Sequence, residues 1–155
     1  LRTDSTVAQL REVARQCRVV SRVVFRGRLG REEVAALLRS ADVAVCTPWY
    51  EPFGIVPLEA MACGVPVVGS AVGGLLDSVV HDGTGVLVPP RDPRAISGAI
   101  GALLADEPRR TRMGASAARR VARLFSWDGV ARQTAQIYDG ILRVAPRYAG
   151  SAELA

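Results

Sequence analysis

Two patterns of apolar residues alternate along the chain. Short runs rich in Val and other apolar residues, bounded by Pro, Gly or Asp, are typical of strands, whereas apolar residues spaced three or four apart are typical of helices. The runs predict strands at residues 22–26, 43–46, 65–68 and 85–88. The spaced positions predict helices at residues 7–17, 32–39, 55–63, 74–80 and 127–143, a long helix from Asp92 and Pro93, and helical segments from Pro108 to about residue 124.

This alternation predicts an α/β fold, a Rossmann-like parallel sheet with helices on both faces. The runs at 43–46 and 65–68 are continuously apolar, so we expect both strands to be buried on both faces. We assign residues 1–144 to one domain and expect residues 145–155 to be a flexible tail. In such sheets ligands bind beyond the carboxyl ends of the strands, beside helix N-termini, which is where chemistry is expected.

The helix caps are also readable. Asp92 is a good N-cap residue, and Pro93 then occupies the first helical position, where its missing N–H costs nothing. Ser126 is the expected cap of the last helix, and Trp127 is expected to pack in the core or against another helix.

Composition narrows the class of protein. The 155 residues are 49% hydrophobic and 23% charged, as in an ordinary globular domain. All basic residues are Arg, and the formal net charge is +5. The densest basic cluster admits two interpretations, a solvated helix face or a patch for phosphate or anionic lipid, and it consists of Arg109, Arg110, Arg112, Arg119, Arg120 and Arg123.

Cysteine and histidine usage bears on location and metals. Cys17, Cys46 and Cys63 show no metal-binding spacing, and an odd number of thiols favours the reducing cytoplasm. With His81 as the one histidine, no metal site is expected, and we interpret His81 as a surface turn residue. No apolar stretch is long enough for a membrane span. The chain starts at Leu1 directly before a helical pattern, so we interpret it as a piece of something longer.

One segment, residues 47–64, carries the candidate chemistry. It leaves a predicted strand, turns through Pro and Gly, and starts a helix near Gly54, so that the free N–H groups of residues 54–56 would face a ligand. Aligned N–H groups at a helix start bind phosphate or diphosphate. Glu51 and Glu59 bracket this start, and a carboxylate beside an anion site suits a sugar diol, which donates two hydrogen bonds. Two Glu residues eight positions apart are common by chance, so spacing alone favours a simpler interpretation: Glu51 is a surface residue, and Glu59 stabilises the first helical turn through the helix dipole.

From about residue 22 to 142, the chain resembles the C-terminal domain of the retaining, GT-B-fold "group 1" glycosyltransferases. The order and the gaps of the matching motifs agree, including two Glu residues eight positions apart. These motifs are Phe25-Arg26-Gly27-Arg28-Leu29, Ser40-Ala41-Asp42-Val43, Glu51-Pro52-Phe53-Gly54, residues 58–68, Gly73-Gly74, residues 83–88, Asp92 and Phe125-Ser126-Trp127. Leu76 and Asp77 stand where the family usually has Pro and Glu, and we interpret Asp77 as a shortened substitute.

The resemblance implies a role for each site residue. Glu59 would hold the donor ribose, and Glu51, the catalytic candidate, would contact the transferred sugar near its anomeric carbon. The remaining donor-binding residues, with backbone amides cradling the diphosphate and the sugar, would be Phe53, Gly54, Ile55 and Val56. The turn of Gly27, Arg28 and Leu29 would contact the nucleobase.

The resemblance also implies a retaining transfer from a nucleoside-diphosphate sugar without bound metal or other cofactor. The domain would be one half of a GT-B architecture lacking its first strands, with the acceptor held by a missing N-terminal domain, so this piece alone is expected to be inactive. Peripheral membrane contact is compatible with this function, and no nucleic-acid partner is expected. Two alternatives stay open: a non-catalytic nucleotide-sugar-binding module, and a basic domain that binds lipid or nucleic-acid surfaces.

Overall fold

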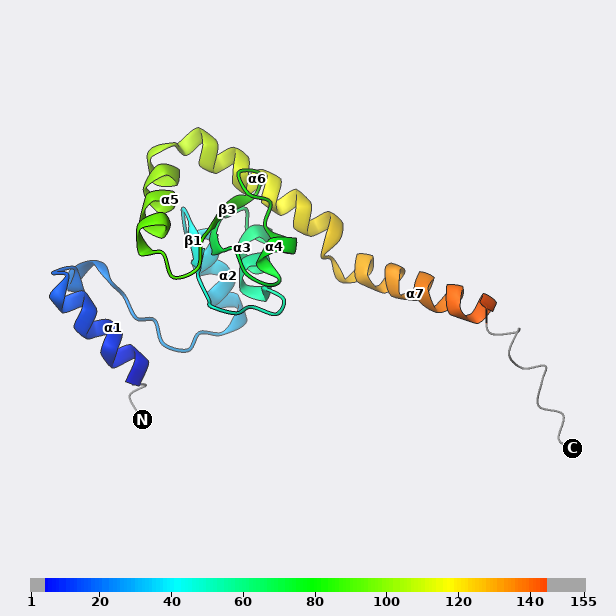
Figure 1. The fold of residues 1–155 in the computed structure, drawn as a ribbon, viewed down its shortest axis with the longest axis horizontal. Coiled ribbons are helices and arrows are strands. Elements are labelled where there is room, and N and C mark those ends of the chain that lie inside the picture. Colours follow the sequence, from blue (N-terminus) through cyan, green and yellow to red (C-terminus); the bar gives the residue numbers. More distant parts are fainter. Residues whose placement is uncertain (1–4, 145–155) are drawn as a thin grey trace, which may run out of the picture. The chain divides into compact units, whose positions relative to one another are not determined.

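The structure is a computed structural model that describes residues 5–144. The chain divides into two compact units, Leu1–Val34 and Ala35–Ala155, and each is described by itself. The predicted tail at residues 145–155 lies outside the described residues. Figure 1 shows the elements in order: α1 (Ser5–Gln16), the 3-10 turn η1 (Val20–Arg22), α2 (Arg31–Arg39), β1 (Ala44–Cys46), α3 (Ile55–Ala62), β2 (Val67–Ser70), α4 (Leu75–Ser78), β3 (Gly85–Val88), α5 (Pro93–Ala105), α6 (Glu107–Leu124) and α7 (Trp127–Val144).

The first unit contains α1 and η1 but no strand within its described residues, so the strand predicted at residues 22–26 is wrong. Its backbone is extended at Val23, yet no neighbouring strand pairs with it in the described part of the chain. Val24 is accordingly 73% exposed. A β-branched run becomes a strand only when a neighbouring strand shares backbone hydrogen bonds with it, and residues 5–144 supply none for this run.

The second unit is built on a parallel sheet with strand order β1-β2-β3. Val68 of β2 lies opposite Val45 of β1 and Val86 of β3. β2 is buried throughout, as predicted, although it begins two residues later than expected. β1 lies at the sheet edge and leaves Val45 49% exposed, so the prediction that this strand is buried on both faces is wrong.

Two hydrophobic clusters cover the two faces of the sheet, which confirms the predicted helix–sheet–helix layering. Val67 of β2 packs with α3 residues such as Met61, whereas the next residue, Val68, packs with Leu103 of α5. Successive side chains of a strand point to opposite faces, so the two clusters lie on opposite sides of the sheet. α6 contributes to both, with Ala117 in the first cluster and Met113 in the second.

α6 reaches both clusters because it runs along the amino ends of the strands. Arg110 forms an ion pair of 3.1 Å with Asp42, which precedes β1, and Arg109 one of 2.6 Å with Asp82, which precedes β3. Between them, the helix approaches the turn before β2 so closely that a Cβ on Gly114 would lie 2.0 Å from the carbonyl oxygen of Gly64. Glycine at position 114 therefore sets the distance between α6 and the sheet.

The helix ends follow the predicted capping. Asp92 Oδ1 accepts from the N–H groups of Arg94 and Ala95, at 3.0 Å each, and Pro93 begins α5. Ser126 Oγ accepts from Gly129 N at 3.2 Å at the start of α7. The prediction for Trp127 is wrong: its side chain is 87% exposed, because it occupies the first helical position and nothing in residues 5–144 covers it.

Two Gly→Ala substitutions should have opposite effects on stability. Gly114→Ala places a methyl group against a backbone oxygen that cannot rotate away, and we expect a loss of roughly 1–3 kcal/mol in the free energy of unfolding. At Gly101 in α5, where a Cβ would meet open space, alanine should add about 0.5–1 kcal/mol through helix propensity. Urea unfolding followed by circular dichroism measures both changes. Equal midpoints for the two variants would contradict the close approach of α6 to Gly64.

Candidate functional site

The site begins where the chain leaves β1 and enters α3. Gly54, the N-cap of α3, has φ +89° and ψ +51°, a left-handed conformation that L side chains rarely adopt. A Cβ there would also lie 3.6 Å from both Leu75 Cδ1 and Ser78 Oγ of α4. Glycine therefore allows the loop to reverse direction directly above α4.

This loop is held against the turn after β2. Gly74 N donates to the carbonyl oxygen of Glu51 at 2.8 Å. A Cβ on Gly73 would lie 2.1 Å from that oxygen, and a Cβ on Gly74 would lie 2.3 Å from the carbonyl oxygen of Phe53. The Gly73-Gly74 pair thus provides the space in which the segment from Glu51 to Phe53 lies, and it fixes the entry into α3.

The Glu51 carboxylate lies at the start of α3. Its Oε1 accepts from Gly54 N at 3.0 Å and from Phe53 N at 3.5 Å. The prediction that the N–H of Gly54 is free is therefore wrong, because the positive end of the helix attracts the nearest carboxylate. Within the described residues, no hydrogen bond uses the N–H of Ile55 or Val56, as predicted.

α3 presents one exposed face beside this start. Pro57, Leu58, Ala60 and Met61 are buried, whereas Ile55, Val56 and Glu59 lie on the exposed side. Ile55 and Val56 are 62% and 59% exposed, so two apolar side chains meet solvent between the two carboxylates. Glu59 forms no ion pair within the described chain. The structure thus brings Glu51, the helix start and Glu59 onto one short stretch of surface.

A cation that no sequence pattern indicated stacks on the loop that leads from β1 to Glu51. The Arg91 guanidinium stacks on the ring of Trp49, 4.4 Å from its centroid. Arg91 follows β3 in a left-handed conformation, with φ +60°, and Trp49 follows β1, so the pair joins loops at the carboxyl ends of two strands. A contact of this kind contributes about 0.5–1 kcal/mol at an exposed position. Trp49 belongs to the segment at residues 47–64, but Arg91 belongs to none of the matching motifs, so the sequence did not indicate that the two residues pair.

The third predicted group, Gly27, Arg28 and Leu29, lies in the first unit. Gly27 has φ +68°, so this turn also requires the left-handed conformation that glycine adopts readily. Arg28 and Leu29 then lead to α2, where Gly30 N donates to Glu33 Oε2 at 2.8 Å.

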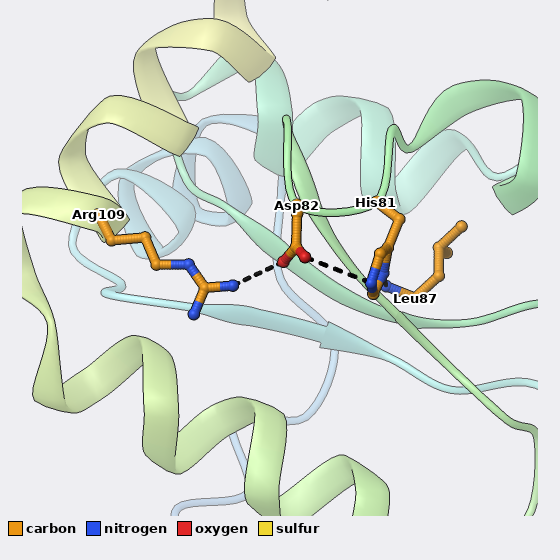
Figure 2. A network of polar contacts seen from close by, with 4 residues as sticks. All are labelled: His81, Asp82, Leu87 and Arg109. Carbon is orange, nitrogen blue, oxygen red and sulfur yellow. Dashed lines mark hydrogen bonds and ion pairs between the residues drawn. The ribbon is translucent and has the colours of Figure 1, made fainter.

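The described residues offer no cluster for a metal. Among residues 5–144, no group of three or more His, Cys, Asp or Glu side chains could hold a metal ion. His81 lies in the turn before β3, as predicted: its Nδ1 accepts from Leu87 N at 3.0 Å, and its Nε2 lies 3.5 Å from Asp82 Oδ2 (Figure 2). None of the helices in this range combines the length and apolar character that crossing a membrane demands.

Cys46 ends β1 close to Glu51. Burial raises the pKa of the Cys46 thiol above its ordinary value, and the negative charge of Glu51 raises it further. The thiol therefore stays protonated at neutral pH, which makes it a poor nucleophile. Because Glu51 contributes to the raised pKa, the reactivity of the thiol depends on the charge of that carboxylate.

Alkylation of Cys46 should thus test the position of Glu51. We expect its rate with iodoacetamide to keep rising above pH 9.0, the ordinary thiol pKa, and the profile of Glu51→Gln to shift to lower pH because only the burial effect remains. Mass spectrometry of the Cys46 peptide measures the rate, with Glu59→Gln as a control that leaves the profile unchanged. An identical profile in Glu51→Gln would show that the carboxylate does not act on the thiol.

Curated relatives of this chain are sugar transferases. It is 43% identical over 134 residues to a D-inositol 3-phosphate glycosyltransferase of Xylanimonas cellulosilytica, covering 86% of this chain and 32% of that protein. It is 42% identical over 125 residues to a glycogen synthase of Mycobacterium tuberculosis, covering 81% and 30%. The chain therefore spans about a third of the length of these relatives.

Solved structures agree with the fold. A sucrose-phosphate synthase of Thermosynechococcus elongatus superimposes with a TM-score of 0.82 at 38% identity, covering 90% of this chain and 35% of that one. Anabaena HepE in complex with UDP-glucose gives 0.82 at 25% identity, covering 90% and 38%. The family described as "Glycosyl transferases group 1" matches residues 4–120. With the glycine-shaped entry into α3 and its two flanking carboxylates in the matched region, the chain belongs to the group 1 glycosyl transferase family.

Proposed function

We propose that this chain binds the nucleoside-diphosphate sugar donor of a retaining glycosyltransferase. The observation that carries the proposal is the start of α3, where two free N–H groups lie between the carboxylates of Glu51 and Glu59. The N–H groups and the helix dipole suit a diphosphate, and each carboxylate suits a diol. A nucleotide sugar carries these three groups in one molecule.

Each residue then has a role in binding. Glu59 accepts hydrogen bonds from the ribose hydroxyls, and the amides of Ile55 and Val56 bind the diphosphate. Phe53 and Gly54 shape the entry, and Glu51 leaves Gly54 to accept from hydroxyls of the transferred sugar. In the first unit, Gly27, Arg28 and Leu29 contact the nucleobase through their backbone.

In the reaction, the donor diphosphate leaves as negative charge builds on its oxygens. The N–H groups of α3 stabilise that charge, which is electrostatic catalysis by preorganised donors. No metal is required for this step. The acceptor comes from a separate N-terminal domain of the full-length cytoplasmic enzyme, and Glu51 lies near the anomeric carbon, whose configuration is retained.

The choice of donor is supported by one relative in particular. HepE of Anabaena was solved with UDP and with UDP-glucose, at TM-scores of 0.82 to this chain. UDP-glucose is therefore the first donor to test, followed by the GDP and ADP sugars.

Glu59→Gln should weaken donor binding. By calorimetry we expect the chain to bind one nucleoside-diphosphate sugar with a Kd on the order of 1 mM, equivalent to about −4 kcal/mol. The substitution replaces the carboxylate that accepts hydrogen bonds from the ribose diol by a neutral amide, and this should weaken binding by about tenfold or more. Glu107→Gln, in the first turn of α6, removes the same charge at the amino ends of the strands, away from the start of α3, and should leave the Kd unchanged. Equal effects of the two variants would contradict the ribose-binding role of Glu59.

Glu51→Ala should separate nucleotide binding from sugar binding. Because the Glu51 carboxylate occupies the helix start, its removal should let free UDP bind a few-fold more tightly by relieving competition and repulsion. The sugar conjugate should lose its affinity advantage over UDP, since the sugar hydroxyls lose their acceptor. Parallel titrations of UDP and UDP-glucose measure both effects. A uniform loss of affinity for both ligands would argue against contact between Glu51 and the sugar.

A further inference from the structure

A basic groove lies between the turn before β3 and the C-terminal half of α6. It has a volume of about 490 Å³ and is lined by Val80, Gly83, Thr84, Ser116, Arg119, Arg120 and Arg123, which we call the basic groove residues. Three of these residues are cationic and none is acidic. The groove lies at the amino ends of the strands, beside the turn that precedes β3. The α3 site lies at the carboxyl ends, so the two sites are separate.

Arg120 is held in place by neutral partners. Its Nη2 donates to the carbonyl oxygen of Asp77 at 2.7 Å, and its Nε to that of Ser78 at 3.0 Å. The guanidinium also lies 5.9 Å from the centroid of the Phe125 ring. These contacts fix the side chain without neutralising its charge, which is therefore presented to the groove.

Among the described residues, the other two guanidiniums of the groove also form no ion pair with a carboxylate. Arg119 Nη2 donates to Ser116 Oγ at 3.0 Å, and Arg123 forms no ion pair among residues 5–144. The acidic residue in the adjacent turn, Asp82, pairs with other residues: its carboxylate lies 2.6 Å from Arg109 and 3.5 Å from His81 (Figure 2). Three like charges around one groove repel one another, and an anion placed between them would relieve this repulsion.

The hydroxyl groups of the groove point to the same ligand chemistry. Thr84 Oγ1 accepts from Val80 N at 2.9 Å, and Ser116 Oγ accepts from Arg119, so each O–H hydrogen remains available to donate. Thr84 is 5% exposed, so its hydroxyl is held in a nearly buried position. The guanidinium groups can only donate, and each hydroxyl still has a hydrogen to donate, so phosphate oxygens suit this set as acceptors.

We propose that the basic groove binds a phosphate group, as a second anion site on the edge of the domain opposite to the donor site. The phosphate can belong to the headgroup of an anionic lipid or to a soluble phosphate compound, and both present the same oxygens to the groove. The site does not depend on the proposed donor chemistry, because none of its residues lies in the segment from Glu51 to Glu59.

Titration of the purified chain with inorganic phosphate and pyrophosphate, at constant ionic strength, tests the proposal. We expect saturable binding, weakened at least tenfold in the double variant Arg119→Gln/Arg123→Gln. Within residues 5–144, neither side chain donates a hydrogen bond to a backbone carbonyl, so the Tm of this variant should match that of the unchanged protein. Arg120 is left intact because it anchors α4. The matched control, Arg112→Gln/Arg132→Gln, removes the same charge from exposed helix positions and should change the Kd less than twofold.

Vesicle sedimentation identifies the source of the phosphate. Vesicles of phosphatidylcholine with and without phosphatidylglycerol are incubated with the chain and with both double variants. Binding only to the anionic vesicles, lost in the Arg119/Arg123 variant and kept in the control, identifies a lipid headgroup. Phosphate binding with the same variant pattern but no vesicle binding identifies a soluble compound. The proposal is overturned if neither probe binds, or if the two double variants lose binding equally, since net charge alone would then explain the result.

Discussion

The close packing of the Glu51–Phe53 backbone on the Gly73-Gly74 turn is the constraint on which the candidate site depends. Two carbonyl oxygens occupy the space that side chains at positions 73 and 74 would fill, and the N–H of Gly74 holds one of them. This contact sets where Gly54 reverses the chain and hence where α3 starts. The orientation of the helix N–H groups and of both carboxylates follows from two residues that have no side chain.

The two ends of the strands serve different purposes. At the carboxyl ends, glycines and exposed apolar residues leave the backbone accessible, as ligand binding requires. At the amino ends, α6 contacts the segments before all three strands, and its ion pairs join it to Asp42 and Asp82. α4 lies between the two regions, since Gly74 contacts Glu51 and the carbonyl of Ser78 accepts from Arg120. A helix of four residues therefore connects the site to the basic groove.

Much of this arrangement could be predicted from the sequence because its signals are local. Asp92-Pro93 identified the start of α5, and Pro and Gly identified the turn into α3. The parallel sheet followed from the alternation of apolar patterns. The failures concern non-local pairing: residues 22–26 have strand character without a pairing strand, and β1 has a core-like sequence at an open edge. The hydrogen bond between Glu51 and Gly54, and the stacking of Arg91 on Trp49, depend on loop geometry that composition does not encode.

The open edge at β1 has a consequence for self-association. An unpaired strand edge offers N–H and C=O groups that can pair with another chain, which is a common route to aggregation. Here the outer strands of the sheet have three and four residues, so each edge offers few backbone groups. A second chain that paired with so short a strand would form few hydrogen bonds, and these would offset little of the conformational entropy that the second chain loses. The brevity of β1 thus limits the number of backbone hydrogen bonds that a second chain could add at this edge.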